Sequence, residues 1–270
     1  QLKNKHKGAR IFCLGNGPSI KKTDLSLLKN EIVIGSNHIN KIFADYGFFP
    51  QYCCITDRKR ILELRGDELL KKSTILVADH MNLSPQADLF TNQEKADYIF
   101  LLQRSKKIYS PLHPFLPLLA NTYHALAPIY YKITPHKKRR PQTLADRKAE
   151  LIRKFFAERS KLSFDLTQGV NLGESVIFTT IQLAAYMGAS EIYLLGVDAD
   201  YSKEKYCFKI DESKFYTNSN FMNDPLGAIN PFFEIFKKDL AHVDKKLFNA
   251  TIGGKLDSVE RKDFYSLFEK

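Results

Sequence analysis

The sequence predicts an α/β protein in which a parallel β-sheet is flanked by helices. Short apolar runs that are typical of buried strands alternate with polar or helical stretches along the chain, and this alternation favours a parallel sheet. The runs also lack the regular apolar and polar alternation of a half-exposed sheet, as expected of strands that are covered on both faces.

The predicted strands lie in both halves of the chain and leave its middle without a clear strand signal. Most fall in the first hundred residues, and the others follow residue 190. Their ranges are Ala9–Gly15, Glu31–Asn37, Gln51–Asp57, Ser73–Asp79, Tyr98–Gln103, Glu191–Asp198 and Leu247–Thr251.

Small or polar residues stand at the end of each of the first four strands. The pairs are Gly15-Asn16, Ser36-Asn37, Thr56-Asp57 and Asp79-His80. Because the carboxyl ends of parallel strands share one edge of a sheet, where ligands bind in open α/β folds, we predict that these residues form one binding edge. A later strand ends in the same way, on Gly196-Val197-Asp198.

The first strand breaks on Gly15-Asn16-Gly17-Pro18-Ser19, the motif that points most directly to a ligand. Its glycines would let a ligand approach the main chain, while Pro18 and Ser19 stiffen the turn and can begin a helix. Such a turn suits a phosphate or a ribose. An ordinary strand-to-loop turn explains the same residues equally well.

We expect a single domain over residues 1–270, with a helical insertion at about 104–160 and a lid at about 199–224. The insertion either binds an acceptor or is a long helical excursion with proline kinks. The lid is polar and aromatic without a clear period, which is typical of a loop near a ligand. One helix is predicted before Gly188, and a last one over Pro231–Leu247.

The formal net charge of +11 predicts an anionic partner. Much of the excess lies at the N-terminus and in His136–Arg140, without a nucleic-acid-binding motif, so we expect no nucleic-acid partner. An anionic substrate, a phosphorylated donor or a negatively charged membrane surface accounts for the charge equally well. No apolar run approaches the roughly 20 residues that cross a bilayer. We expect a cytoplasmic protein, with peripheral association with the inner face of the membrane left open.

The cysteines are expected to be core residues of a reduced, cytoplasmic protein. Three of them lie in strand-like runs, and none has the spacing of a metal ligand. They are Cys13, Cys53, Cys54 and Cys207.

Three segments together resemble the sialyltransferase-like α/β fold, which is Rossmann-like: FCLGNGPSI, VIGSNHI and GESVIFTTIQLAAYMGASEIYLLGVD. That group includes small bacterial sialyltransferases and a domain family named after an archaeal hydroxymethylpterin diphosphokinase, which the LFNATIGGKL segment also resembles. The resemblance covers most of the chain except residues 104–150, and implies a pocket for the cytidine monophosphate (CMP) part of a nucleotide sugar. The implied residues are Asn16, Gly17, Pro18, Ser19, Asn37, Thr56, Asp57, Gly173 and Ser175. Ser36 joins them as a polar strand end.

The resemblance also implies catalytic groups, because the sialyltransferases use paired lid tyrosines to stabilise the departing phosphate and a histidine as general base. The tyrosines of the predicted lid are Tyr201, Tyr206 and Tyr216. The lid has no histidine, and His242 falls in a predicted surface helix. We therefore predict Tyr206 and Tyr216 as phosphate-stabilising groups and Asp198 as the base, unless the reaction needs little base help. Alternative bases are Asp200 and Asp224.

The resemblance implies a glycosyltransferase that moves a sialic-acid-like or other nonulosonic sugar from a CMP-activated donor to a cell-surface glycan or glycolipid. No cofactor is required, since tyrosines and helix-terminus amides can stabilise a phosphate leaving group, although Asp198-Ala199-Asp200 leaves magnesium open. One alternative is an ATP-dependent diphosphokinase of the hydroxymethylpterin type, with magnesium on converging carboxylates. These would be Asp57, Asp79, Asp198 and Asp200. The other is a non-catalytic nucleotide-binding module of an envelope-assembly protein.

Overall fold

A computed structural model describes the sheet and the elements that cover it. The described residues are 2–56, 60, 63, 72–79, 98–102, 161–171, 173, 175–202, 204–209 and 224–269. The predicted insertion lies outside them, as does the part of the predicted lid between residues 210 and 223.

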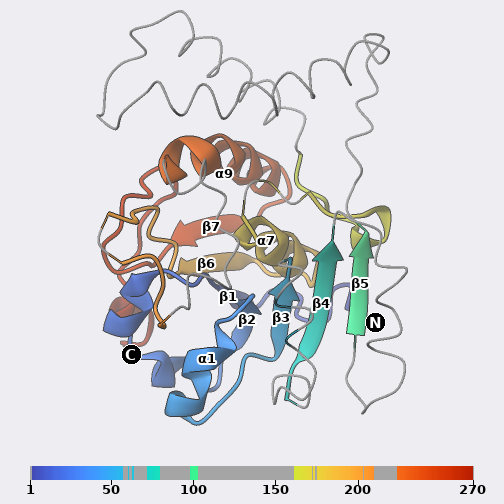
Figure 1. The fold of residues 1–270 in the computed structure, drawn as a ribbon. Coiled ribbons are helices and arrows are strands. Elements are labelled where there is room, and N and C mark those ends of the chain that lie inside the picture. The colour runs from blue at the N-terminus through green and yellow to red at the C-terminus, as the bar shows by residue number, and fades with distance from the viewer. Residues whose placement is uncertain are drawn as a thin grey trace, which may run out of the picture.

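Seven strands form one sheet in the order β5-β4-β3-β2-β1-β6-β7. Every neighbouring pair is parallel, which confirms the predicted α/β fold. The strands are β1 Arg10–Leu14, β2 Ile32–Ser36, β3 Tyr52–Ile55, β4 Thr74–Asp79, β5 Tyr98–Leu102, β6 Glu191–Leu195 and β7 Lys246–Asn249. The strand arrows turn progressively from β7 to β5 (Figure 1), as the twist of a sheet requires.

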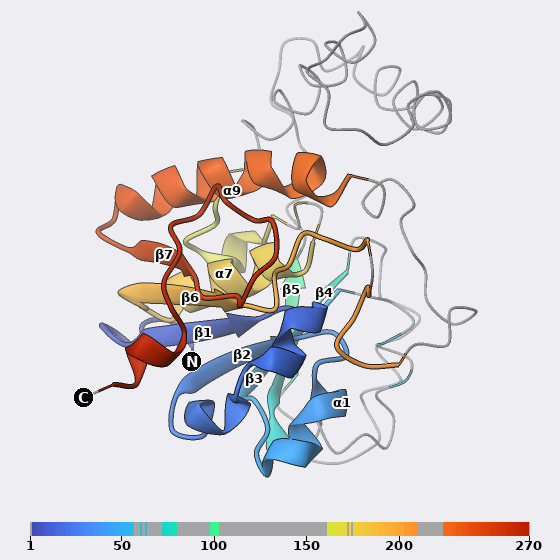
Figure 2. The same ribbon diagram turned by 90° about the vertical axis from the view of Figure 1, so that its left-hand side faces the viewer.

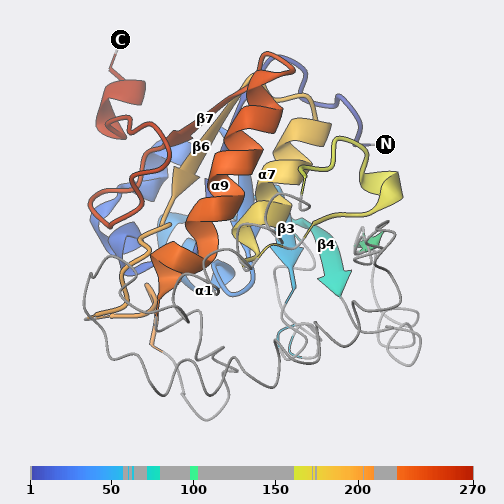
Figure 3. The same ribbon diagram turned by 90° about the horizontal axis from the view of Figure 1, so that it is seen from above.

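Long helices cover one face of the sheet, and short helical turns cover the other. The long helices, α7 Ile177–Tyr186 and α9 Pro225–Ala241, lie alongside one another above the strands (Figures 2 and 3). The opposite face carries η1 Pro18–Lys22, η2 Leu25–Leu28, α1 Asn40–Phe43, η3 Ala44–Tyr46 and η5 Tyr265–Leu267. A further turn, η4 Leu166–Gln168, precedes α7. Among the described helices, none is both long enough and apolar enough for a bilayer crossing.

Both faces of the sheet bury apolar side chains, which explains why the strand sequences are apolar without alternation. On the α7 and α9 side, the Phe178 ring lies 4.8 Å from that of Phe233. On the other side, the Phe12, Tyr193 and Phe248 rings stack across three neighbouring strands in register. All four cysteines are buried, as their sequence context predicts.

Helix α9 begins six residues earlier than predicted, at Pro225 rather than at Pro231. The prediction placed a proline in the first turn, where its missing N–H costs nothing, but Pro225 fills that role. The Asp224 carboxylate accepts a hydrogen bond from the Gly227 amide at 2.9 Å and caps the helix. Pro231 therefore lies inside α9.

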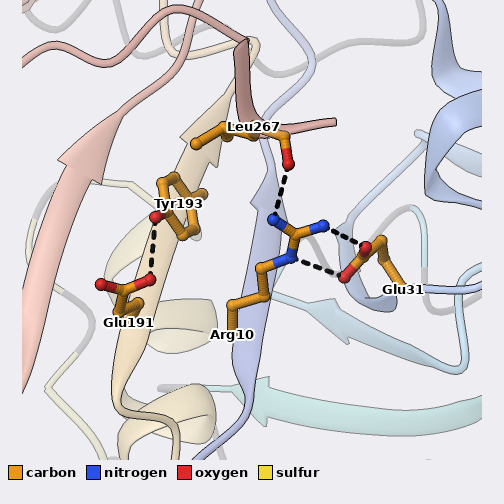
Figure 4. A network of polar contacts seen from close by, with 5 residues as sticks. All are labelled: Arg10, Glu31, Glu191, Tyr193 and Leu267. Atoms are coloured by element: carbon orange, nitrogen blue, oxygen red, sulfur yellow. Dashed lines mark hydrogen bonds and ion pairs between the residues drawn. The ribbon is translucent and has the colours of Figure 1, made fainter. Parts of the chain in front are cut away.

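A polar network closes the amino edge of the sheet (Figure 4). Arg10 donates hydrogen bonds to both carboxylate oxygens of Glu31 and to the carbonyl of Leu267. Nearby, the Tyr193 hydroxyl donates to the Glu191 carboxylate at 2.9 Å, and burial together with this carboxylate raises the pKa of Tyr193 to about 12. The network ties the starts of β1 and β2 to the C-terminal segment, at the edge away from the predicted ligand-binding residues.

The strand order reverses beside β1, whose neighbours are β2 on one side and β6 on the other. The chain between β1 and β2 crosses one face of the sheet, whereas α7 and α9 cross the other. In open α/β sheets, a crevice forms outside the carboxyl ends of the strands at such a switch point. The exits of β1 and β6 therefore mark the candidate site.

Candidate functional site at the sheet's carboxyl edge

Asn16 and Ser36, at the exits of β1 and β2, are joined by a short hydrogen-bonded chain. The Ser36 hydroxyl donates to the Leu14 carbonyl at 2.6 Å, and Asn16 Nδ2 donates to Ser36 Oγ at 3.4 Å. Ser36 is fully buried. Asn16 Oδ1 is also buried, and within the described part of the chain it has no hydrogen-bond partner. An unsatisfied buried acceptor lowers the stability of the fold by about 1–3 kcal/mol. We therefore expect a hydrogen-bond donor to bind at Asn16 Oδ1.

The glycines of the turn are required by the close approach of the exit of β6. A Cβ at Gly15 would lie 2.5 Å from the Gly196 carbonyl oxygen, and one at Gly17 would overlap the Asp198 carboxylate. The Gly17 amide also donates to the Gly196 carbonyl at 2.9 Å. This close approach of the two strand exits could not be read from the sequence, and a ligand contact at these glycines stays a prediction.

Ser19 and Asp198 form a buried pair across the switch point. The Ser19 hydroxyl donates to Asp198 Oδ2 at 2.7 Å, and the Ser19 amide donates to Oδ1 at 3.2 Å. Asp198 is 6% exposed. Burial raises the pKa of its carboxyl, while the hydrogen bonds from Ser19 and the charge of Lys22 oppose the rise.

Asp200, the other carboxylate of the predicted Asp-Ala-Asp motif, is held by an ion pair. Lys255 Nζ lies 2.8 Å from its Oδ2. This contact and the hydrogen bond from Ser202 lower the pKa of Asp200 to about 2. The Lys255 amide also donates to the Asp198 carbonyl. Both carboxylates thus have protein partners, and among the described residues no group of three His, Cys, Asp or Glu could hold a metal ion.

Asn37 continues the pairing of β2 with β3 beyond the end of each strand. Its amide donates to the Cys54 carbonyl, and its side-chain oxygen accepts a hydrogen bond from the Thr56 amide at 3.0 Å. The Asn37 backbone is left-handed, with φ +44°, a conformation that asparagine tolerates better than most residues. Asn37 and Thr56 therefore lie together, as the shared-edge argument predicts.

Sequence reasoning missed a polar cluster beside Asn37 in which two basic side chains are buried. Arg60, 3% exposed, donates to Asn40 Oδ1 at 2.9 Å and to the Asn37 carbonyl at 3.4 Å. His38, 4% exposed, has its Nε2 3.3 Å from a carboxylate oxygen of Glu63, which also pairs with Arg60. No local pattern marks these residues, because they come together only where the segments that follow β2 and β3 meet.

The first part of the predicted lid packs on the turn after β1 (Figure 2). The Cys207 amide donates to the Asn16 carbonyl at 2.9 Å, and Glu204 pairs with Lys21. Tyr206 stacks on Phe208, with ring centroids 5.7 Å apart. This segment, 204–208, therefore covers Asn16.

A second tyrosine of the predicted lid lies at the same exit. Burial raises the pKa of Tyr201, and the nearby Tyr206 and Asp198 raise it further to a smaller extent. Tyr201 therefore shares its surroundings with the residue predicted as the base and with one predicted phosphate-stabilising group.

The predicted glycine-rich helix start lies at the carboxyl edge as well. The C-terminal end of α7 meets the segment before β1, where the His6 amide donates to the Met187 carbonyl, so its N-terminal end faces the opposite edge. Asn171 Oδ1 accepts from the Gly173 amide, and Ser175 Oγ accepts from the Ile177 amide.

Gln182, which sequence reasoning also missed, fixes the loop that leads into α7. This fully buried side chain accepts hydrogen bonds from the Ser163 and Asn171 amides. It donates to the carbonyls of Asn171 and Phe178. The amide therefore has all four of its hydrogen-bonding positions filled.

Other predicted residues lie elsewhere. Asp57 and Tyr216 fall outside the described residues. Asp224, an alternative base, caps α9. His242 is exposed at the C-terminal end of α9, next to the start of β7 at the amino edge.

Comparison with known proteins supports the fold. No protein-family model matches this sequence, and no curated protein does. Among solved structures, the chain is similar to one described as the MAf glycosyltransferase from Magnetospirillum magneticum AMB-1, with 13% identity and a TM-score of 0.50. The match covers 98% of this chain and 35% of that one, so this chain spans about a third of that protein's length.

Proposed function

We propose that this chain is a glycosyltransferase that binds a nucleotide-activated sugar beside the exits of β1 and β6. One observation carries the proposal: polar residues from separate strand exits meet at the switch point of the sheet. Asn16 contacts Ser36, and Ser19 contacts Asp198. A switch point is where open α/β sheets bind ligands. The fold likeness to a protein described as a glycosyltransferase supports the class of reaction.

The proposed donor is a CMP-linked acidic sugar of the sialic or nonulosonic type, and the proposed acceptor is a glycan or glycolipid. The net charge of +11 suits an anionic donor. At the start of α7, the positive end of the helix dipole favours a phosphate, beside Gly173 and Ser175. Asn37 and Thr56 would flank the nucleotide. A basic protein of this kind could also bind an anionic membrane surface.

In the proposed reaction, an acceptor hydroxyl attacks the anomeric carbon of the donor sugar. The bond from that carbon to the phosphate oxygen breaks, and its electron pair leaves with CMP. The hydroxyl proton passes to Asp198, whose raised pKa favours proton uptake. Tyr206 would stabilise the charge that develops on the departing phosphate. Tyr216 keeps the same proposed role.

The proposed reaction requires no metal, because tyrosine hydroxyls and the positive dipole end of α7 supply the stabilisation of the leaving group. Asp198 and Asp200 are already engaged by Ser19 and Lys255. Turnover that is unchanged by a chelator is the expected result.

Calorimetric titration with CMP, with ATP plus magnesium and with guanosine diphosphate tests the proposal. CMP is expected to bind most tightly, and Asn37→Ala is expected to weaken its binding by about 1–3 kcal/mol. Asn230→Ala on α9, which removes a contact with Ser258, is the matched control and should bind normally. Preference for ATP with magnesium would favour the diphosphokinase, and no loss in Asn37→Ala would remove Asn37 from the site.

A further inference from the structure

Most backbone donors of the turn after β1, residues 15–20, are already engaged within the protein. A phosphate-binding turn needs free N–H groups that point at the ligand. Here four amides donate to protein acceptors, namely those of Gly15, Gly17, Ser19 and Ile20. Pro18 has no N–H to offer. The turn therefore lacks the row of free amides that a phosphate requires.

The proton positions fix the orientation of the Asn16 side chain. The Leu14 carbonyl can only accept, so the Ser36 hydroxyl must give its hydrogen to it across their 2.6 Å contact. Ser36 Oγ then has only lone pairs left and must face the NH₂ group of Asn16. Asn16 Oδ1 consequently points away from Ser36, buried and without a partner among the described residues.

Ser19 presents an acceptor for the same reason. Its single hydroxyl hydrogen is donated to the Asp198 carboxylate at 2.7 Å. Only lone pairs remain on Ser19 Oγ for a ligand. Phosphate oxygens carry negative charge and no hydrogen, so they would meet acceptors and a carboxylate at this turn.

We infer that the turn binds a hydrogen-bond donor, the vicinal ribose hydroxyls of the nucleotide, and that the phosphate lies elsewhere at the carboxyl edge. This inference rests on the proposed function, and it decides between the phosphate and the ribose that the sequence left open. Ribose hydroxyls can donate to Asn16 Oδ1 and to Ser19 Oγ. Ser36 is a positioning residue, because its lone pair holds the Asn16 amide in the orientation that presents Oδ1.

Affinity ratios in the wild-type chain test the inference without any variant. Calorimetry compares CMP with its 2′-deoxy and 3′-deoxy analogues and with cytidine, which lacks the phosphate. At least one deoxy analogue is expected to bind about tenfold or more weakly than CMP, as the loss of a hydrogen bond to a buried acceptor implies. Equal affinity for CMP and both deoxy analogues would overturn the inference.

Two variants then identify the residues that distinguish CMP from its deoxy analogues. Asn16→Ala is expected to reduce the ratio between CMP and the deoxy analogue to within about twofold, and to leave the ratio between CMP and cytidine unchanged. Ser36→Ala should partly reduce the ratio between CMP and the deoxy analogue. A merely structural role of Ser36 would not produce this change. A ratio between CMP and cytidine that collapses in Asn16→Ala, with the ribose ratio intact, would place the phosphate at the turn and overturn the inference.

The same titrations separate the inference from the proposed function. If CMP binds but Asn16→Ala keeps the ribose discrimination, only the inference fails. If CMP and its analogues do not bind the wild-type chain at all, the proposed function fails, and the inference fails with it.

Discussion

Ser19 and Asp198, 179 residues apart in sequence, meet at the switch point of the sheet, where the serine hydroxyl donates to the carboxylate at 2.7 Å. The pair joins the turn after β1 to the exit of β6. It also determines what the turn offers a ligand, because the Ser19 hydrogen is already used. The same carboxylate belongs both to the packing of the fold and to the proposed chemistry.

Asp198 and Asp200 are expected to affect stability with opposite dependence on pH. The pKa of Asp198 is raised above its usual 3.8 by burial, so the folded chain holds this proton longer than the unfolded chain. The contribution of Asp198 to the free energy of unfolding therefore falls as the pH rises above about 3.8. The pKa of Asp200 is lowered to about 2, so its contribution is present above about 3.8 and is lost as the pH falls toward 2.

Denaturant unfolding of Asp198→Asn and Asp200→Asn across acidic pH measures this contrast. Relative to wild type, Asp198→Asn should gain stability as the pH rises through the titration of Asp198. Asp200→Asn should lose stability relative to wild type as the pH rises from about 2 to 4, where the Lys255 ion pair forms. Parallel curves for the two variants would contradict the different surroundings of the two carboxylates.

Gly17→Ala is expected to destabilise the fold by roughly 1–3 kcal/mol or more, the usual cost of overpacking a filled site. The new Cβ would overlap the Asp198 carboxylate and lie 2.6 Å from the Gly196 carbonyl oxygen. Gly47→Asn is the control, since Gly47 has open space around its Cβ position and a φ of +69°, which asparagine tolerates. Thermal unfolding compares them, and an unaltered melting temperature in Gly17→Ala would refute the close contact.

Gln182→Leu is expected to cost roughly 2 kcal/mol or more, because it leaves buried backbone groups of the 161–171 loop without partners. Thr179→Val on the same helix is the matched control. Thr179 is fully buried, and its hydroxyl has no partner among the described residues, so removing that hydroxyl should be neutral or stabilising. Equal losses of unfolding free energy in both variants would argue against the role of Gln182 in holding the 161–171 loop.

Tyr206→Phe is expected to lower donor turnover by about a hundredfold, the usual cost of removing a group that stabilises charge in the transition state. His242→Ala should keep near-normal turnover, because His242 lies exposed at the end of α9, near the amino edge. Both variants are first shown to be folded by circular dichroism. Loss of activity only in His242→Ala would instead identify His242 as the general base.

The sheet could be predicted from the sequence because its strands are buried on both faces. Cys13 and its apolar neighbours form a run that needs no partner to be recognised, and the structure places β1 within a residue of the predicted ends. The start of α9 was less predictable, because Pro225 and Pro231 both suit a first turn. Only the cap at Asp224 decides between them.

The polar residues of the candidate site could be predicted, but their partners could not. Asn16, Ser36 and Asn37 stand at strand ends that the sequence shows directly. The partners depend on contacts between distant segments, as with Gly17 and Gly196 or Asp200 and Lys255. Local patterns carry no information about which loops meet, so the packing requirement for a glycine at position 17 could not be predicted.

Hydrogen–deuterium exchange with and without saturating CMP tests most directly whether the exits of β1 and β6 form the ligand site. CMP should slow exchange in residues 15–19, 36–38 and 196–208, and leave the amino edge around Arg10 and Tyr193 unchanged. Protection confined to the amino edge, or no protection in the turn after β1, would contradict a nucleotide site at the carboxyl edge.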